Sequence, residues 1–195
     1  VSWSGIPIRM KYNVNIAKSD SRKVKKKEKK VLQAKRKERK EKKAKNLSDR
    51  QVWSVKLAEK LKPIHRASDN RAKVLAERVL KRIDSAKNGM VTRSNKKNIE
   101  CTVTIEQLRE LVFEAYGKTC RYCKKRLDVT TYVFDHIIPV SQGGGTTVEN
   151  LQVICKTSNN AKGAMSAEHF DLLLEWLKTV PEELSKSILC RLAGG

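Results

Sequence analysis

The stretch FDHIIPVSQGGGTTVENLQVICKTSNNAKG, from residue 134 to residue 163, constrains this chain more than any other. An apolar, strand-like run ends in Asp135 and His136, and Asn150 and Asn159 follow fourteen and twenty-three residues beyond that histidine. A fold alone seldom requires Asp, His and Asn at such wide spacing, whereas metal-assisted chemistry uses all three residue types. The stretch predicts a strand, a flexible glycine-rich loop, a second strand and a short helix, arranged around a site.

These residue types suit the hydrolysis of a phosphodiester. Such a reaction needs a base to activate water, a cation to neutralise the developing charge, and positive groups to hold the backbone. His136 is the expected base, because an imidazole with a pKa of about 6.5 accepts a proton near neutral pH. Asp135 and Asn159 offer the hard oxygen ligands that Mg²⁺ prefers. A kink must bring Asp135 and His136 to one site, since neighbours on a regular strand face opposite ways. Lys162 is expected to contact a phosphate.

The pattern DHIIP…GG…NL…N-x-x-K resembles the HNH endonuclease family over roughly residues 104–177. The resemblance implies a ββα-metal fold, in which two antiparallel strands and a helix hold one divalent cation, Mg²⁺ or Mn²⁺. By position it implies that Asp135 and Asn159 bind the metal and that His136 is the general base. Asn150 would steady the histidine loop by hydrogen bonding rather than touch the metal. The expected products carry a 5′-phosphate and a 3′-hydroxyl. Asn160 competes with Asn159 as the ligand, and spacing favours Asn159.

The cysteines indicate a reducing compartment. An odd count with one Cys-x-x-Cys pair is less typical of a disulfide framework than of free thiols or a metal site. We therefore expect a cytoplasmic or nucleoid-associated protein. The five cysteines are Cys101, Cys120, Cys123, Cys155 and Cys190.

Many members of the HNH family hold a structural zinc ion with two Cys-x-x-Cys pairs. Cys120 and Cys123 match the first pair, but the second would be Cys155 and position 158, which is Ser158. Three thiolates remain where tetrahedral zinc takes four ligands. Two interpretations stay open. Either zinc binds with a fourth ligand from elsewhere, or the cysteines pack as small apolar residues without a metal. The other candidates for the fourth ligand are Cys101, Cys190, His169 and water.

The charge of the chain points to a polyanionic partner. The formal net charge is +22, and residues 22–45, here called the basic segment, hold fifteen Lys or Arg against three Glu. Each neutralised phosphate releases counterions, so such a segment favours nucleic acid as the partner. We interpret it as an arm along DNA phosphates, with RNA as the other candidate. A solvated linker and a localisation signal are the alternatives.

No membrane is expected as a partner, because the sequence contains no run of eighteen apolar residues and no signal-peptide pattern. The basic segment also lacks the apolar face that insertion into a membrane surface requires. The first residue is Val1 rather than Met, so we expect an alternative start or a processed or trimmed chain.

Local signals predict helices before the strands. Asn46 or Ser48 is expected to cap a helix that Pro63 ends, and another helix is expected from Asp69 to the Asn88-Gly89 pair. Residues 91–100 indicate a polar linker, and residues 1–20 an irregular or strand-like lead.

Further helices flank the strands more closely. Thr104 and Gln107 have the capping-box spacing, which predicts a helix that ends at Gly117. Residues 118–128 predict a knuckle-like turn. Ser166 and Pro181 are expected to begin the last two helices.

Together these signals predict an α+β protein that is mostly helical. A ββα-metal module is flanked by helices and preceded by a basic, partly helical or disordered N-terminal arm. We expect the arm over residues 1–46, a helical region and linker over 47–100, and a nuclease domain over 101–195. The predicted function is a metal-dependent DNA endonuclease, and family analogy favours a bacteriophage or mobile-element setting. The alternative is a catalytically inactive module that binds DNA or RNA.

Overall fold

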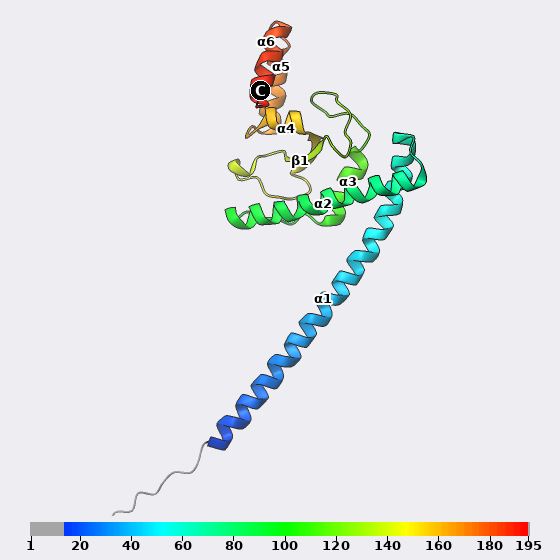
Figure 1. The fold of residues 1–195 in the computed structure, drawn as a ribbon. Coiled ribbons are helices and arrows are strands. Elements are labelled where there is room, and N and C mark those ends of the chain that lie inside the picture. The colour runs from blue at the N-terminus through cyan, green and yellow to red at the C-terminus, as the bar shows by residue number, and fades with distance from the viewer. Residues whose placement is uncertain (1–13, 195) are drawn as a thin grey trace, which may run out of the picture. The chain divides into compact units, whose positions relative to one another are not determined.

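The computed structural model describes residues 14–194, with side chains from residue 26 onward. The described residues form a mostly helical α+β structure with one two-stranded antiparallel sheet, as predicted. The chain divides into two compact units, one ending at Asp49 and the other beginning at Arg50. In chain order the elements are α1 (Val14–His65), α2 (Asp69–Lys97), α3 (Ile105–Ala115), β1 (Tyr132–His136), η1 (Val140–Gln142), β2 (Leu151–Cys155), α4 (Lys156–Lys162), α5 (Ala167–Leu177) and α6 (Glu182–Leu192) (Figure 1).

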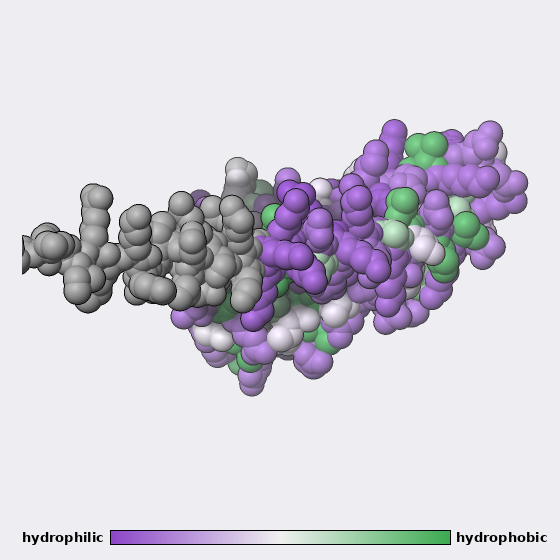
Figure 2. Space-filling view, turned by 90° about the horizontal axis from the view of Figure 1, so that it is seen from below, coloured by the Kyte–Doolittle hydropathy of each residue, from purple (hydrophilic) through white to green (hydrophobic). Residues whose placement is uncertain are grey.

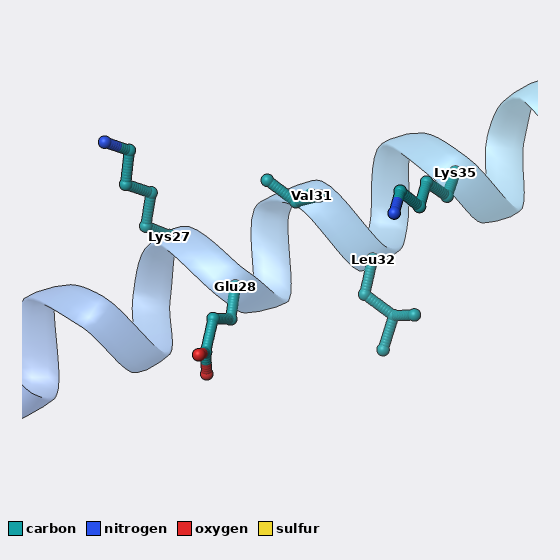
Figure 3. Close-up of a pocket in the computed structure, with 5 residues that line it drawn as sticks. All are labelled: Lys27, Glu28, Val31, Leu32 and Lys35. Atoms are coloured by element: carbon teal, nitrogen blue, oxygen red, sulfur yellow. The ribbon is translucent and has the colours of Figure 1, made fainter.

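The basic segment is helical throughout and lies within α1. Its lysine, arginine, glutamate and alanine residues are good helix formers, and ion pairs one turn apart add to them, such as Glu38 with Lys42 at 2.6 Å. Figure 3 shows the side chains around Val31 and Leu32 projecting from a single helix. Val31 is 49% and Leu32 51% exposed, so these residues form no buried core. The helix here depends on local propensity.

The start of α1 corrects the expectation for this region. No helix begins at Asn46 or Ser48, because α1 runs unbroken from Val14. A capping residue starts a helix only where the chain before it is not helical, and strong helix formers precede these two residues. The irregular lead predicted for residues 1–20 lies outside the described residues up to residue 13 and is wrong from Val14 on.

Both long helices also end later than predicted. Pro63 lies inside the last turn of α1. α2 passes through Asn88-Gly89 and ends at Lys97, and the next residue, Asn98, adopts a φ of 51°. The linker predicted over residues 91–100 is therefore wrong for its first seven residues. Met90 explains this outcome, since it is only 2% exposed. Burying such a side chain contributes about 1.5–3 kcal/mol, more than the roughly 1 kcal/mol that a glycine costs inside a helix.

The hydrophobic core of the second unit joins the end of α1 to α2 and α3. Leu57 and Leu61 are fully buried, as are Val79, Leu80 and Ile83 of α2 and Leu108 of α3. Trp53 meets Phe113 edge to face, with ring centroids 6.1 Å apart. Ion pairs also join α1 to α2 beside this core, since Arg50 pairs with both Glu77 and Asp84 of α2. The last turns of α1 therefore belong structurally with the C-terminal half of the chain.

The predicted strand–loop–strand–helix arrangement is present. β1 and β2 pair antiparallel, with Asp135 opposite Gln152 and His136 opposite Leu151. Thr104 forms the predicted capping box with Gln107 at the start of α3, and Gly117 follows that helix with a φ of 81°. α2 lies on one side of β1, and α4, α5 and α6 lie on the other (Figure 1).

On the face shown in Figure 2, hydrophilic residues cover most of the described surface, and hydrophobic residues form small separate patches. None of the helices in residues 14–194 is long and apolar enough to cross a membrane.

Candidate active site and cysteine cluster

Three of the predicted catalytic residues line one pocket of about 280 Å³, here called the His136 pocket. Asp135 and His136 come from the end of β1, and Asn159 comes from α4. Loop residue Thr146 and the second half of α2 complete the wall. The lining residues are Met90, Arg93, Ser94, Lys97, Phe134, Asp135, His136, Val140, Thr146 and Asn159.

Asp135 is held by two neighbours and is 7% exposed. The ammonium of Lys162 lies 3.3 Å from one carboxylate oxygen and 3.2 Å from the other. Gln152, the cross-strand neighbour of Asp135, donates its amide N–H to the carboxylate at 2.9 Å. Two separate elements therefore fix the direction of the carboxylate: β2 through Gln152, and α4 through Lys162.

Lys162 does not meet the expectation that it contacts a phosphate. The residue is 1% exposed, and its ammonium also donates to the backbone carbonyl of His136 at 2.8 Å. A buried ammonium needs such partners, because an unpaired charge in the interior costs several kcal/mol. The physical reason for the difference is that α4 packs against β1 and turns this lysine inward. Its role here is to hold the strand end that carries Asp135 and His136.

His136 is oriented by a chain of hydroxyl groups. Its Nε2 atom lies 3.0 Å from Thr146 Oγ1, which lies 3.1 Å from Ser94 Oγ on α2. Thr146 and Ser94 are 1% and 2% exposed, so water does not compete for these bonds. Burial lowers the pKa of His136, and nearby Arg93 and Lys162 lower it further, against an opposing effect of Asp135. The imidazole is therefore neutral at pH 7, as a base must be.

Asn150 holds the loop between the two strands. Its side-chain oxygen accepts from Ile138 N–H at 2.8 Å, and its amide nitrogen donates to the carbonyls of Ile138 at 3.0 Å and Gly145 at 2.8 Å. Gly144 is required beside it, because a Cβ there would collide with the Ile138 carbonyl oxygen. These bonds hold the loop, which is the structural part of the role that the resemblance implies for Asn150.

The two adjacent asparagines of α4 lie in different surroundings. Asn159 lines the His136 pocket. Asn160 directs its amide nitrogen toward the carbonyl oxygen of Ala193 at 3.5 Å, at the end of α6. This geometry favours Asn159 as the candidate ligand, in agreement with the spacing.

The donor atoms in the His136 pocket suit a hard divalent cation. Asp135 supplies a carboxylate and Asn159 an amide oxygen, which are the ligand types of Mg²⁺ and Mn²⁺. Magnesium sites commonly use one or two protein ligands and complete the shell with water and substrate phosphate. The residues present therefore fit such an ion.

The three cysteines predicted as a zinc set come together. The Sγ atoms of Cys120, Cys123 and Cys155 lie within 4.8 Å of one another, and this cysteine cluster could hold a metal ion. The sulfur atoms of Cys123 and Cys155 lie 3.2 Å apart. Burial raises the pKa of the Cys120 thiol, but hydrogen bonds from the Cys123 and Cys155 backbones outweigh it and bring the pKa to about 7. A thiol with this pKa ionises readily, which favours metal binding.

Ser158 lies beside two sulfur atoms of the cysteine cluster. Its Oγ atom lies 3.5 Å from Cys120 Sγ and 3.3 Å from Cys155 Sγ, and the residue is 4% exposed. The other proposed fourth ligands, Cys101, Cys190 and His169, are not part of the group of ligand atoms that gathers here.

Sequence reasoning did not find Gln152, Thr146, Ser94 and Arg93. Gln152 becomes visible once the strand register is known, since it lies opposite Asp135. Ser94 and Arg93 fall in the segment predicted as a linker, and no local pattern marks them as neighbours of His136. Thr146 lies in the glycine-rich loop, and no local pattern distinguishes it from the neighbouring Thr147.

The segment from residue 120 to residue 172 matches a family model described as HNH endonuclease. The match contains both strands, α4, the His136 pocket residues of β1 and α4, and the cysteine cluster. A search of curated proteins found no match for the chain. Residues 120–172 are therefore similar to the HNH endonuclease family, as the motif indicated, and that family implies a nucleic-acid substrate. The helices α1, α2 and α3 lie outside the matched segment.

Proposed function

We propose that this protein is a metal-dependent endonuclease that hydrolyses DNA phosphodiester bonds. The observation that carries the proposal is the convergence of Asp135, His136 and Asn159 on one pocket, with His136 oriented by Thr146. Nucleic-acid binding alone does not require a neutral, oriented imidazole at His136 next to the anchored carboxylate of Asp135, whereas hydrolysis does.

His136 acts as the general base. The tautomer that leaves a base free is the one in which Nε2–H donates to the Thr146 hydroxyl, since Nδ1 can then accept a proton from the attacking water. Asp135 and Asn159 would hold the divalent cation, which supplies charge for the developing phosphorane and the leaving oxygen. Lys162 and Gln152 keep Asp135 in place, and Asn150 keeps the loop shape that sets the position of His136. Water attack on the phosphorus leaves a 5′-phosphate and a 3′-hydroxyl.

DNA is the proposed substrate and RNA the alternative. The basic segment supports a polyanion of either kind, because phosphate contacts carry no sequence or sugar information. The free cysteines support a reducing compartment, such as the cytoplasm or nucleoid. An inactive module that only binds nucleic acid is the second candidate, and cleavage assays decide between the two.

The test is cleavage of supercoiled plasmid with Mg²⁺, with Mn²⁺, and with EDTA in excess of the metal. We expect nicked or linear product with either ion, none with EDTA, and recovery when Mg²⁺ is restored. A structured RNA of equal nucleotide concentration tests the substrate class. If the full-length protein binds plasmid but cleaves neither substrate with any divalent ion, the protein is a binding module.

We also propose that the cysteine cluster binds a structural zinc ion, with Ser158 at the fourth position. Three thiolates with a nearby hydroxyl make a weaker site than four thiolates, because neutral serine oxygen is a poor zinc ligand. Ser158→Cys should therefore raise zinc affinity by about tenfold or more, measured by competition with a chromogenic chelator. Ser158→Ala is the matched control and should not raise it. A purified protein that contains no zinc, and whose thermal unfolding is unchanged by added zinc, would show that the cysteines are structural without a metal.

A further inference from the structure

The second half of α2 forms one wall of the His136 pocket, although it lies outside the segment that matches the family. Met90 and Ser94 are both 2% exposed and line this pocket. Ser94 bonds Thr146, which in turn bonds His136. The chain after α2 strengthens the attachment, because the backbone of Thr146 bonds both Glu100 and Val103. This wall is therefore anchored to the loop that orients the base.

Two exposed cations of α2 line the same pocket. Arg93 and Lys97 lie four residues apart, one turn of helix, and flank the buried Ser94. Among the described residues that line the pocket, Asp135 is the one carboxylate, and the buried Lys162 already pairs with it. No acid within the lining set is left to neutralise Arg93 or Lys97, so both charges are available to a substrate at this pocket.

A phosphodiester at this site needs cationic partners that Lys162 does not supply. Arginine presents a planar fork that bonds two phosphate oxygens at once, while lysine acts as a point charge. Positive groups of this kind raise the rate when they meet charge that develops in the transition state. Arg93 directly precedes Ser94, which bonds Thr146, the hydroxyl partner of His136, so Arg93 is the better placed of the two for the scissile group.

We infer that Arg93 and Lys97 of α2 are the phosphate-binding residues of this nuclease, with Arg93 on the scissile phosphate and Lys97 on a neighbouring phosphate of the same strand. The inference rests on the proposed function and extends the substrate site beyond the family segment. It assigns to α2 the role that the sequence suggested for Lys162.

The chain provides a matched control in Lys96. This residue is exposed and precedes Lys97 on the same helix, but it does not line the pocket, because neighbouring residues point about 100° apart on a helix. Arg93→Ala, Lys97→Ala and Lys96→Ala each remove one positive charge from the same surface. The three substitutions should therefore weaken DNA binding equally through general electrostatics. Any further difference in binding or cleavage between them would come from a contact in the His136 pocket.

The experiment measures single-turnover cleavage of a short duplex at saturating DNA, and duplex binding in EDTA, for the full-length variants. Arg93→Ala should lower the cleavage rate at saturation by about tenfold or more, with Arg93→Lys intermediate. Added guanidinium should raise the rate of Arg93→Ala and leave that of His136→Ala unchanged. Lys97→Ala should weaken binding about threefold to fivefold, and Lys96→Ala should change either quantity less than about twofold. Far-UV circular dichroism checks that each variant is folded.

The outcomes separate this inference from the proposed function. If the unmodified protein cleaves and Arg93→Ala behaves like Lys96→Ala, the inference is overturned while the nuclease proposal stands. If the unmodified protein does not cleave, the nuclease proposal fails, and the binding comparison still decides about the pocket. Weaker binding by Arg93→Ala and Lys97→Ala than by Lys96→Ala would then support a phosphate site, and equal binding would exclude it.

Discussion

The basic segment and the ββα module use positive charge in opposite ways. The basic segment carries fifteen Lys or Arg, and its described side chains are exposed along one helix. In the module, Lys162 is a single cation that is 1% exposed and bonds both Asp135 and the His136 carbonyl. Many exposed charges contribute together to nucleic-acid binding, so the loss of one is offset by the others. A buried charge instead contributes through bonds to particular atoms. Single substitutions should therefore matter greatly in the module and little in the basic segment.

The largest effect is expected at the base. His136→Ala should lower the cleavage rate by about a hundredfold or more, the usual scale for loss of a general base. DNA binding should change little, because the imidazole is neutral. The measurement is single-turnover cleavage of plasmid, with the exposed His169→Ala as the control histidine. Near-normal turnover by His136→Ala would remove this residue from the mechanism.

The next effect distinguishes the two asparagines of α4. Asn159→Ala should reduce cleavage at limiting Mg²⁺ by about tenfold to a hundredfold, because it removes a proposed oxygen ligand. Asn160→Ala should reduce it much less, since this side chain turns toward Ala193. Titration of Mg²⁺ against initial rate gives the comparison. A greater loss with Asn160→Ala would show that the ligand is the second asparagine.

Removal of the basic segment should affect binding more than chemistry. Deleting residues 1–46 should weaken DNA binding by about tenfold at moderate salt and flatten the slope of binding against log salt, because fewer counterions are released. Cleavage at saturating DNA should largely recover, since Leu57, Leu61 and the core of the second unit remain. An unchanged salt slope would identify the basic segment as a solvated linker. Lost cleavage at saturation, with the fold intact, would mean that these residues help to build the site.

The smallest effect is expected for one cation of the basic segment. Lys40→Ala should change DNA affinity by less than about twofold, because it removes one of fifteen similar charges. Fluorescence anisotropy with a labelled duplex provides the measurement. A tenfold loss from this substitution would show that Lys40 makes a specific contact, and the contrast between the two regions would not hold.

The sequence by itself determined the elements whose signals are local. The capping box at Thr104, the two strands, the glycine-rich loop and the helix from Ser166 follow from residues a few positions apart, and the structure contains each of them. The meeting of Asp135, His136 and Asn159 was predicted because their spacing in this motif implies a shared site. The loop-holding bonds of Asn150 were predicted in the same way.

The tertiary structure alone decided which distant segments meet. Ser94 bonds Thr146 across 52 residues of chain, and Lys162 pairs with Asp135 across 27, so no short pattern records either contact. The same reason explains why α2 continues past Gly89, because the burial of Met90 outweighs a local signal to end the helix. Burial and ion pairing depend on what the rest of the chain brings to a residue. These long-range contacts set the inward turn of Lys162 and the position of Arg93 and Lys97 at the pocket.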